Sequence, residues 1–317
     1  MLSPHMAFKL TVAKEQQPDL FQHLLLVTLI AHYLAVRIKL SGMDMENLLS
    51  AALFHDLGEL HINPEVLNSK NDLSEIERHH IYAHPIISCL IVREVAGINP
   101  AVSTAILQHH ERLDGSGYPY WLHGDKISIV ARIVSISDAC ASIFARFGNS
   151  KRMSIWIRLN SKKYGPELLS LLLEGFGPIT IDPIATNNVE LTRLEAASQL
   201  FETWDEFRAL LGLAAAANYS PPGELEFMFD RMASLRSILF QFGFDPSGLE
   251  SLIEIAMTDH HIANELAVVL DEIEWQFIDL EREICRRREL IRVALNEGEN
   301  HHFDNWTKRL LASLVAM

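Results

Sequence analysis

The stretch HHERLDGSGYP, residues 109–119, places two histidines and a glutamate directly before a glycine-rich loop. We expect the two histidines to end a helix that Asn99-Pro100 opens, because asparagine favours the N-cap position and proline the first turn. Imidazole and carboxylate groups are ligands of divalent metal ions. This helix end is therefore a candidate for part of a metal site.

Other histidines and carboxylates extend this candidate site. Eight of the 15 histidines lie between residues 55 and 123, and His55-Asp56 ends another expected helix. Asp138 and His23 lie within apolar helical segments, where a polar side chain is costly unless it is paired or bound to metal. Each residue alone is more often a packed or surface side chain. The joint pattern, which contains no thiolate, favours iron, manganese or another borderline divalent ion over structural zinc.

The remaining sequence predicts an all-α protein with two domains. Helical spacing of apolar residues runs almost throughout, and alternation of apolar and polar residues is scarce. Glycine and proline cluster at residues 175–183, which predicts a boundary between a domain at 1–178 and a helical-bundle domain at 183–317. The expected helices cover 18–40, 46–54, 74–96 with a break near Pro85, 99–110, 127–147, 188–217, 224–242 and 260–297, with a loop at 59–72.

Charge and composition limit the partners and the location. The chain of 317 residues has 27 basic and 41 acidic side chains, a net charge of −14, which argues against binding to DNA or anionic membranes. The most apolar run, Leu24 to Val36, is shorter than the ~20 residues that span a bilayer. The three cysteines are far apart, as is typical of a reducing compartment. We expect a cytoplasmic protein.

A heptad-like seam runs along the helix expected at 260–297. Apolar residues keep a four-three spacing from Leu266 to Ile291, interrupted by Arg287. The seam predicts either packing inside one bundle or an interface between two copies. A helix of about 37 residues would be ~55 Å long, which exceeds what a compact domain of this size covers. We therefore also predict a homodimer.

The sequence resembles the HD-GYP phosphohydrolases, a branch of the HD superfamily. The resemblance rests on His55-Asp56-Leu57-Gly58, His84-Pro85, residues 109–119 and residues 131–138, and it covers about residues 15–178. His23 lies 32 residues before His55, and His84 lies 29 after it, as the family pattern expects. The resemblance implies a helical domain that holds two or three ions, usually iron or manganese. The implied ligands are His23, His55, Asp56, His84, His109, His110 and Asp138.

Members of this family hydrolyse cyclic di-GMP to pGpG and often onward to GMP, and related members act on other cyclic dinucleotides. For this chain, the resemblance implies that a metal-bridging hydroxide beside Asp56 attacks phosphorus. It also implies a third ion at Asp19, because some members have an acidic residue four positions before the first histidine. The residues implied to contact substrate, or a diguanylate cyclase-type partner, are Asp114, Gly115, Gly117, Tyr118, Pro119 and Arg146.

Two positions depart from the family pattern. Glu59 stands where the family usually has a lysine that meets a substrate phosphate. The Arg-Pro-Tyr segment that often follows the last metal aspartate is missing, and Arg146 and Lys151-Arg152 are the nearest basic residues. These departures favour an alternative function, a metal-containing receptor or scaffold that signals through protein contacts without hydrolysis. The complete ligand set favours the enzyme.

Overall fold

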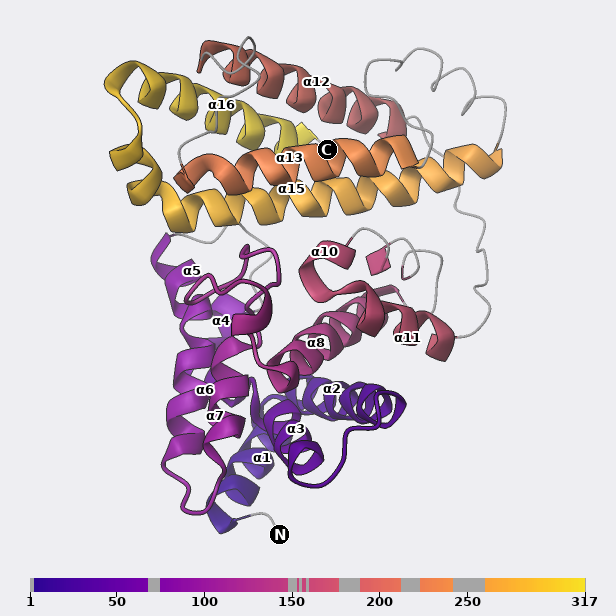
Figure 1. The fold of residues 1–317 in the computed structure, drawn as a ribbon, viewed down its shortest axis with the longest axis vertical. Coiled ribbons are helices and arrows are strands. Elements are labelled where there is room, and N and C mark those ends of the chain that lie inside the picture. Colours follow the sequence, from indigo (N-terminus) through magenta and orange to yellow (C-terminus); the bar gives the residue numbers. More distant parts are fainter. Residues whose placement is uncertain are drawn as a thin grey trace. The chain divides into compact units, whose positions relative to one another are not determined.

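The computed structural model describes residues 3–67, 75–147, 153, 156–157, 160–176, 189–211, 223–241 and 260–316. Helices dominate this part of the chain, in which the one extended pairing is an isolated antiparallel bridge between Asp114 and His123. The all-α class predicted from the sequence is confirmed. The chain divides into two compact units, Met1–Thr180 and Ile181–Met317 (Figure 1).

The N-terminal unit consists of short and medium-length helices. They are α1 (Pro4–Gln16), α2 (Pro18–Arg37), α3 (Met43–Phe54), η1 (Leu57–His61), α4 (Pro64–Leu67), α5 (Glu75–Tyr82), α6 (His84–Arg93), α7 (Pro100–Gln108), η2 (Gly124–Lys126), α8 (Ile129–Phe147), α10 (Ser161–Tyr164) and α11 (Pro166–Phe176). The expected break near Pro85 is present, because this proline lies in the first turn of α6 and cannot continue α5. The loop expected at 59–72 is wrong in part, since η1 and α4 form there, and α1 was not expected.

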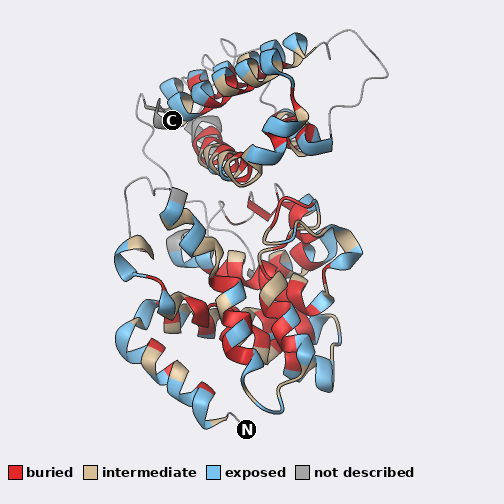
Figure 2. Cartoon of the chain, turned by 90° about the vertical axis from the view of Figure 1, so that its left-hand side faces the viewer, coloured by how far each residue is buried: buried red, intermediate tan, exposed pale blue. Residues whose placement is uncertain are grey.

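Helix α2 packs against α1, α3, α8 and α11. Its buried stripe includes Leu24, Val27, Ala31 and Leu34, at the three-four spacing of a helix face that is covered by neighbours. Figure 2 shows buried residues gathered in the interior of this unit. By length and composition alone α2 could also cross a membrane, a test that core helices and leader segments pass as well. The buried stripe is that of a core helix.

The C-terminal unit contains four longer helices. They are α12 (Val189–Leu210), α13 (Gly223–Gln241), α15 (His260–Ala294) and α16 (Glu297–Ala316), of which α16 was not expected. Helix α15 packs against the other three, and α12 also packs against α16 (Figure 1). This arrangement is a helical bundle whose longest member is covered by its neighbours.

The heptad-like seam of α15 faces the inside of this bundle. All of its apolar members are buried within the unit: Leu266, Leu270, Ile273, Phe277, Leu280, Ile284 and Ile291. Burial within the unit accounts for this spacing without a second copy, and the homodimer stays a prediction. Of the two interpretations of the spacing, packing inside one bundle is the one that the structure shows.

Candidate metal centre

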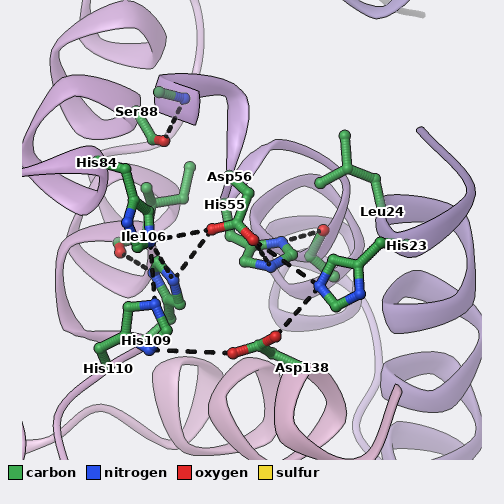
Figure 3. Close-up of polar contacts among 12 residues, drawn as sticks. His23, Leu24, His55, Asp56, His84, Ser88, Ile106, His109, His110 and Asp138 are labelled. Carbon is green, nitrogen blue, oxygen red and sulfur yellow. Dashed lines mark hydrogen bonds and ion pairs between the residues drawn. The ribbon is translucent and has the colours of Figure 1, made fainter. Parts of the chain in front are cut away.

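The helices of the N-terminal unit bring seven of the predicted ligands to one place (Figure 3). His23 comes from α2, His55 and Asp56 follow the end of α3, His84 begins α6, His109 and His110 follow α7, and Asp138 lies in α8. Contacts of α3 with α2, α7 and α8, and of α6 with α7, hold these segments together. Five of the seven residues lie at helix ends, where the chain turns and a side chain can reach the space between helices.

The ligand atoms form two groups that share Asp56. Within each group, one nitrogen or oxygen atom per residue lies within 4.8 Å of every other. One group is Asp56, His84, His109 and His110, and the other is His23, His55, Asp56 and Asp138. Asp56 Oδ1 lies 3.1 Å from His84 Nε2, and Oδ2 lies 3.0 Å from His55 Nε2. The two oxygens of one carboxylate thus face two sets of nitrogens (Figure 3), which is the arrangement of a bridging ligand.

The backbone sets the orientation of three of the imidazole rings. The contacts are His55 Nδ1 to Ala52 O at 2.8 Å, His84 Nδ1 to Ile81 O at 2.6 Å and His109 Nδ1 to Ile106 O at 2.6 Å. A carbonyl oxygen only accepts, so each Nδ1 carries the hydrogen and each Nε2 is left with a lone pair when the ring is neutral. Nε2 of His84 and Nε2 of His109 lie 3.3 Å apart. Two lone pairs at that distance repel unless a cation lies between them.

Two buried polar atoms also indicate a metal ion. His55 Nε2 and Asp56 Oδ1 have no hydrogen-bond partner outside the cluster, and their nearest polar neighbours are the other candidate ligands, at 3.0 to 3.3 Å. Buried polar groups are rarely left in this state, and each one that is needs an explanation such as an ion. Both atoms belong to the two groups described above, so bound divalent ions would satisfy them. The residues present therefore fit a pair of divalent metal ions.

Charge in the site keeps both carboxylates ionised. Burial alone would raise the pKa of Asp56, but His55 and His84 hold it well below its usual range. Burial would also raise the pKa of Asp138, and the hydrogen bond with His23 Nε2, at 3.1 Å, lowers it overall. Two ionised carboxylates in a buried site need a compensating positive charge.

The histidines divide into two classes. Burial lowers the pKa of His109 and, together with its charged neighbours, that of His110, which keeps both rings in the neutral form that binds metals. Burial also acts to lower the pKa of His55, but the adjacent Asp56 carboxylate outweighs it and raises the pKa to about 9. A positive charge is thus favoured beside Asp56, where a metal ion would replace the proton.

A glycine lets η1 lie against the start of α6. Gly58 N donates a hydrogen bond to Ser88 Oγ at 2.7 Å. A Cβ atom at position 58 would collide with the carbonyl oxygen of His84 and lie 2.8 Å from Ser88 Oγ. This close approach fixes Asp56 relative to His84. Ser88 was not predicted as a site residue, and its signal is a small polar side chain one helical turn after His84.

The glycine-rich loop is fastened to the same helix end. The ring of Tyr118 stacks on that of His110 with centroids 4.7 Å apart, and Tyr118 N donates to His110 O at 3.2 Å. The buried Glu111 carboxylate accepts hydrogen bonds from Tyr120 N at 2.7 Å and Leu122 N at 2.9 Å. Glu111, which was not predicted as a functional residue, therefore positions the loop beside the metal ligands. The signal was its place between the two histidines and the loop.

The other loop residues have local roles. Gly115 has a φ of +78°, and a Cβ atom there would collide with the His123 ring. The Asp114 carboxylate accepts from the backbone and the hydroxyl of Ser116. Gly117 packs against the backbone of residues 110–112, where a side chain has no room. The half-buried Pro119 follows Tyr118 in the same loop.

Two predicted residues, Asp19 and Glu59, belong to neither ligand group, and the side chain of a third, Arg146, is not described. Asp19 is exposed in the first turn of α2 and belongs to neither ligand group, so the structure gives no support to a third ion there. Arg146 lies in α8, but its side chain is outside the described part of the chain, and so are Lys151 and Arg152. Glu59, in η1, is half-buried, and burial and the Asp56 charge raise its pKa to about 7.

Comparison with known proteins identifies the domain. Residues 20–143, which contain all seven clustered ligands, match the model of the HD domain. This part of the chain is therefore an HD domain, a helical fold built around His and Asp metal ligands. Its His-Asp pair and its Gly-Tyr-Pro loop are the features by which it resembles the HD-GYP phosphohydrolases.

Named relatives share the same region. The chain is 36% identical over 118 residues to 3'3'-cGAMP-specific phosphodiesterase 1 of Vibrio cholerae, covering 37% of this chain and 27% of that protein. It is 28% identical over 155 residues to the cyclic di-GMP phosphodiesterase PdeB of Borreliella burgdorferi, covering 47% of this chain and 41% of that protein. It is 31% identical over 131 residues to a cyclic di-GMP phosphodiesterase of Thermotoga maritima, covering 39% and 36%. Each match spans less than half of the relative.

A solved structure has a weaker likeness. The crystal structure of a cyclic GMP-AMP-specific phosphodiesterase of V. cholerae, V-cGAP3, aligns over 99% of this chain and 97% of that chain, with 14% identity and a TM-score of 0.40. This score is too low to add to the description of the fold.

Proposed function

We propose that the N-terminal unit is a metal-dependent phosphodiesterase that hydrolyses a cyclic dinucleotide. The observation that carries this proposal is the Asp56 carboxylate, which lies between two groups of histidine and aspartate ligands. Two divalent ions in such a site polarise a phosphoryl group and lower the pKa of coordinated water to near neutrality. We propose iron or manganese as the ions, since the donors are imidazoles and carboxylates without a thiolate.

We propose cyclic di-GMP as the substrate and pGpG, then GMP, as products. The printed names of the relatives support a cyclic dinucleotide, although they divide between cyclic di-GMP and 3'3'-cGAMP. Tyr118 supports a nucleotide ligand, because its half-buried ring borders the metal ligand His110 and an aromatic face can stack on a base. Asp56 and Asp138 hold the ions in this proposal, and the Gly-Tyr-Pro loop lines the nucleotide site.

Glu59 favours a second candidate function, a metal-containing receptor that binds the nucleotide without cleaving it. A carboxylate beside the site repels a phosphodiester where a lysine would attract it. In this role the Gly-Tyr-Pro loop would pass the signal to a diguanylate cyclase-type protein in the cytoplasm. The complete set of seven ligands supports the enzyme over the receptor.

A turnover assay separates the two functions. The full-length chain, purified without oxygen and loaded with Mn²⁺ or Fe²⁺, is mixed with cyclic di-GMP or 3'3'-cGAMP, and the products are separated by chromatography. The enzyme predicts pGpG from cyclic di-GMP, loss of turnover in Asp56→Ala and normal turnover in Asp19→Asn, whose side chain is exposed. Tight binding without cleavage by either metal form supports the receptor. Absence of both binding and cleavage removes cyclic di-GMP from either function.

A further inference from the structure

The position of Glu59 in η1 directs its side chain to the same side as Asp56. A 3-10 helix has three residues per turn, so side chains at positions i and i+3 eclipse each other. Asp56 is the N-cap residue of η1 and Glu59 lies three positions later, with Glu59 N donating to Asp56 O at 2.9 Å. The residue that replaces the family's lysine therefore lies on the face of η1 that carries the bridging carboxylate.

The backbone between these two acids is held in place. Gly58 lies between Asp56 and Glu59 in the sequence. It lies against His84 and Ser88 too closely for a side chain. A shift of η1 that turned Glu59 away from the metal ligands would have to break this contact. The backbone that carries Glu59 is thus held beside the start of α6.

The electrostatic surroundings of Glu59 consist of the predicted metal ligands. Burial is the main cause of its raised pKa, Asp56 raises it further, and His84 is the strongest of the groups that lower it. Within the described part of the chain, no hydrogen bond or ion pair holds the Glu59 carboxylate. A half-buried carboxylate beside a second one is costly without a cation, and a divalent ion held by Asp56 and His84 would remove that cost.

We propose that Glu59 is part of the metal site, as an outer ligand that contacts the ion on the His84 side through a coordinated water. The contact runs through water because the Glu59 oxygens are not among the atoms that lie within 4.8 Å of one another in either group. This inference rests on the proposed function, since it requires the same pair of ions. It gives the acidic replacement a role, because the chain then gains affinity for the metal at the position where the family pattern has a lysine.

Calorimetric titration of the metal-free, full-length chain with MnCl₂ tests this role without an activity assay. Glu59→Gln is expected to weaken Mn²⁺ binding about tenfold, as removal of an outer-sphere partner of a metal site does, and Glu59→Lys is expected to weaken it further. Glu59→Asp, which keeps the charge, should retain more affinity than Glu59→Gln. The matched control is Glu65→Gln, an exposed acid a few residues along the chain, with unchanged affinity.

The outcomes separate this inference from the proposed function. If Glu59→Gln binds Mn²⁺ with wild-type affinity and Asp56→Ala does not bind it, the role of Glu59 is overturned. The proposed metal centre is then still supported. An equal loss of affinity in Glu65→Gln also overturns it, since the effect is then one of general charge. Absence of Mn²⁺ binding in the wild type contradicts the proposed function itself. Circular dichroism spectra and melting curves of each variant show whether it is folded.

Discussion

Asp56 owes its position to a contact that a single methyl group would prevent. Gly58 brings the backbone of η1 against the first turn of α6, and Ser88 Oγ accepts the hydrogen bond from its amide. The Asp56 carboxylate and His84 lie on the two sides of this contact. The geometry of the candidate metal centre is therefore set partly by a residue that has no side chain to bind a metal.

Gly58→Ala is expected to destabilise the N-terminal unit and to weaken metal binding. The added Cβ atom must displace the His84 carbonyl, and overpacking of this kind costs ~1–3 kcal/mol. Urea unfolding and Mn²⁺ titration measure the two effects. Gly223→Ala is the control, because a Cβ atom there has no neighbour within 4 Å and should change stability by less than ~0.5 kcal/mol. A Gly58→Ala protein with wild-type stability and metal affinity would show that the contact is not tight.

Glu111 acts on the loop through two backbone amides. Its carboxylate accepts from Tyr120 N and Leu122 N, and hydrogen bonds to a charged group contribute ~1.5–3 kcal/mol each. We expect Glu111→Gln to speed hydrogen exchange at these amides by roughly tenfold or more, because a neutral amide oxygen is a weaker acceptor. Metal content should stay unchanged, since Glu111 lies in neither ligand group. Unaltered exchange at both amides would contradict this positioning role.

At the scale of the element, α15 is a core helix of its own unit. Phe277 is fully buried and contacts Phe201 of α12, with ring centroids 5.7 Å apart. Phe277→Ala should therefore destabilise the C-terminal unit by ~3–5 kcal/mol, measured by urea unfolding. Val293, which is 87% exposed on the same helix, supplies the control, and Val293→Ala should change stability by less than ~0.5 kcal/mol.

Light scattering on the same samples tests whether the seam packs within one chain or between two copies. If the wild-type chain is a dimer that Phe277→Ala converts to a folded monomer of unchanged stability, then the seam is an interface and its assignment to the bundle is wrong.

Helix α15 also carries a buried acid that should make the C-terminal unit sensitive to pH. Glu283 Oε1 lies 2.8 Å from Arg287 Nη2, and Oε2 lies 3.8 Å from Arg231 Nη2. Burial outweighs the attraction of these arginines and raises the pKa of Glu283 from 4.5 to about 7. Between these values the folded chain keeps a proton that the unfolded chain has released. Stability should therefore fall as the pH rises from about 4.5 to about 7.

The variant Glu283→Gln removes this titration, so that the fall in stability, on the order of 3 kcal/mol for a shift of this size, should largely disappear. Urea unfolding at pH 5, 6, 7 and 8 measures it, and the transition that Phe277→Ala weakens identifies the C-terminal unit. Glu289→Gln, at an exposed position on α15, should keep the wild-type dependence on pH. A wild-type unit whose stability is constant over this range would contradict the effect of burial at Glu283.

For the molecule as a whole, the sequence motifs predicted the cluster of candidate ligands better than they predicted which segments pack against helix α15. The resemblance to the HD-GYP pattern, whose intervals His23, His55 and His84 match, implied that these residues share one site. The seam of α15 identified buried residues correctly, but spacing alone does not distinguish a neighbour in the same chain from a second copy. Helix α16, which helps to cover the bundle, was not recognised in its polar sequence.

The site contacts that were not predicted from the sequence depend on segments that approach each other only in the folded chain. Gly58 and Ser88 are 30 residues apart and meet only because η1 and α6 pack together. Asp19 lies one helical turn from His23, but its side chain is exposed and joins neither ligand group, and a third ion there stays a prediction. Position along a helix fixes the face of a residue, and the neighbouring helices decide whether that face belongs to the site.

Anomalous X-ray diffraction from crystals of the Mn²⁺-loaded, full-length chain tests the central claim, that Asp56 bridges two metal ions, most directly. The account predicts two anomalous peaks, one bound by His84, His109 and His110 and the other by His23, His55 and Asp138, with an oxygen of Asp56 on each. A single peak, or two peaks that do not share the Asp56 carboxylate, would contradict it.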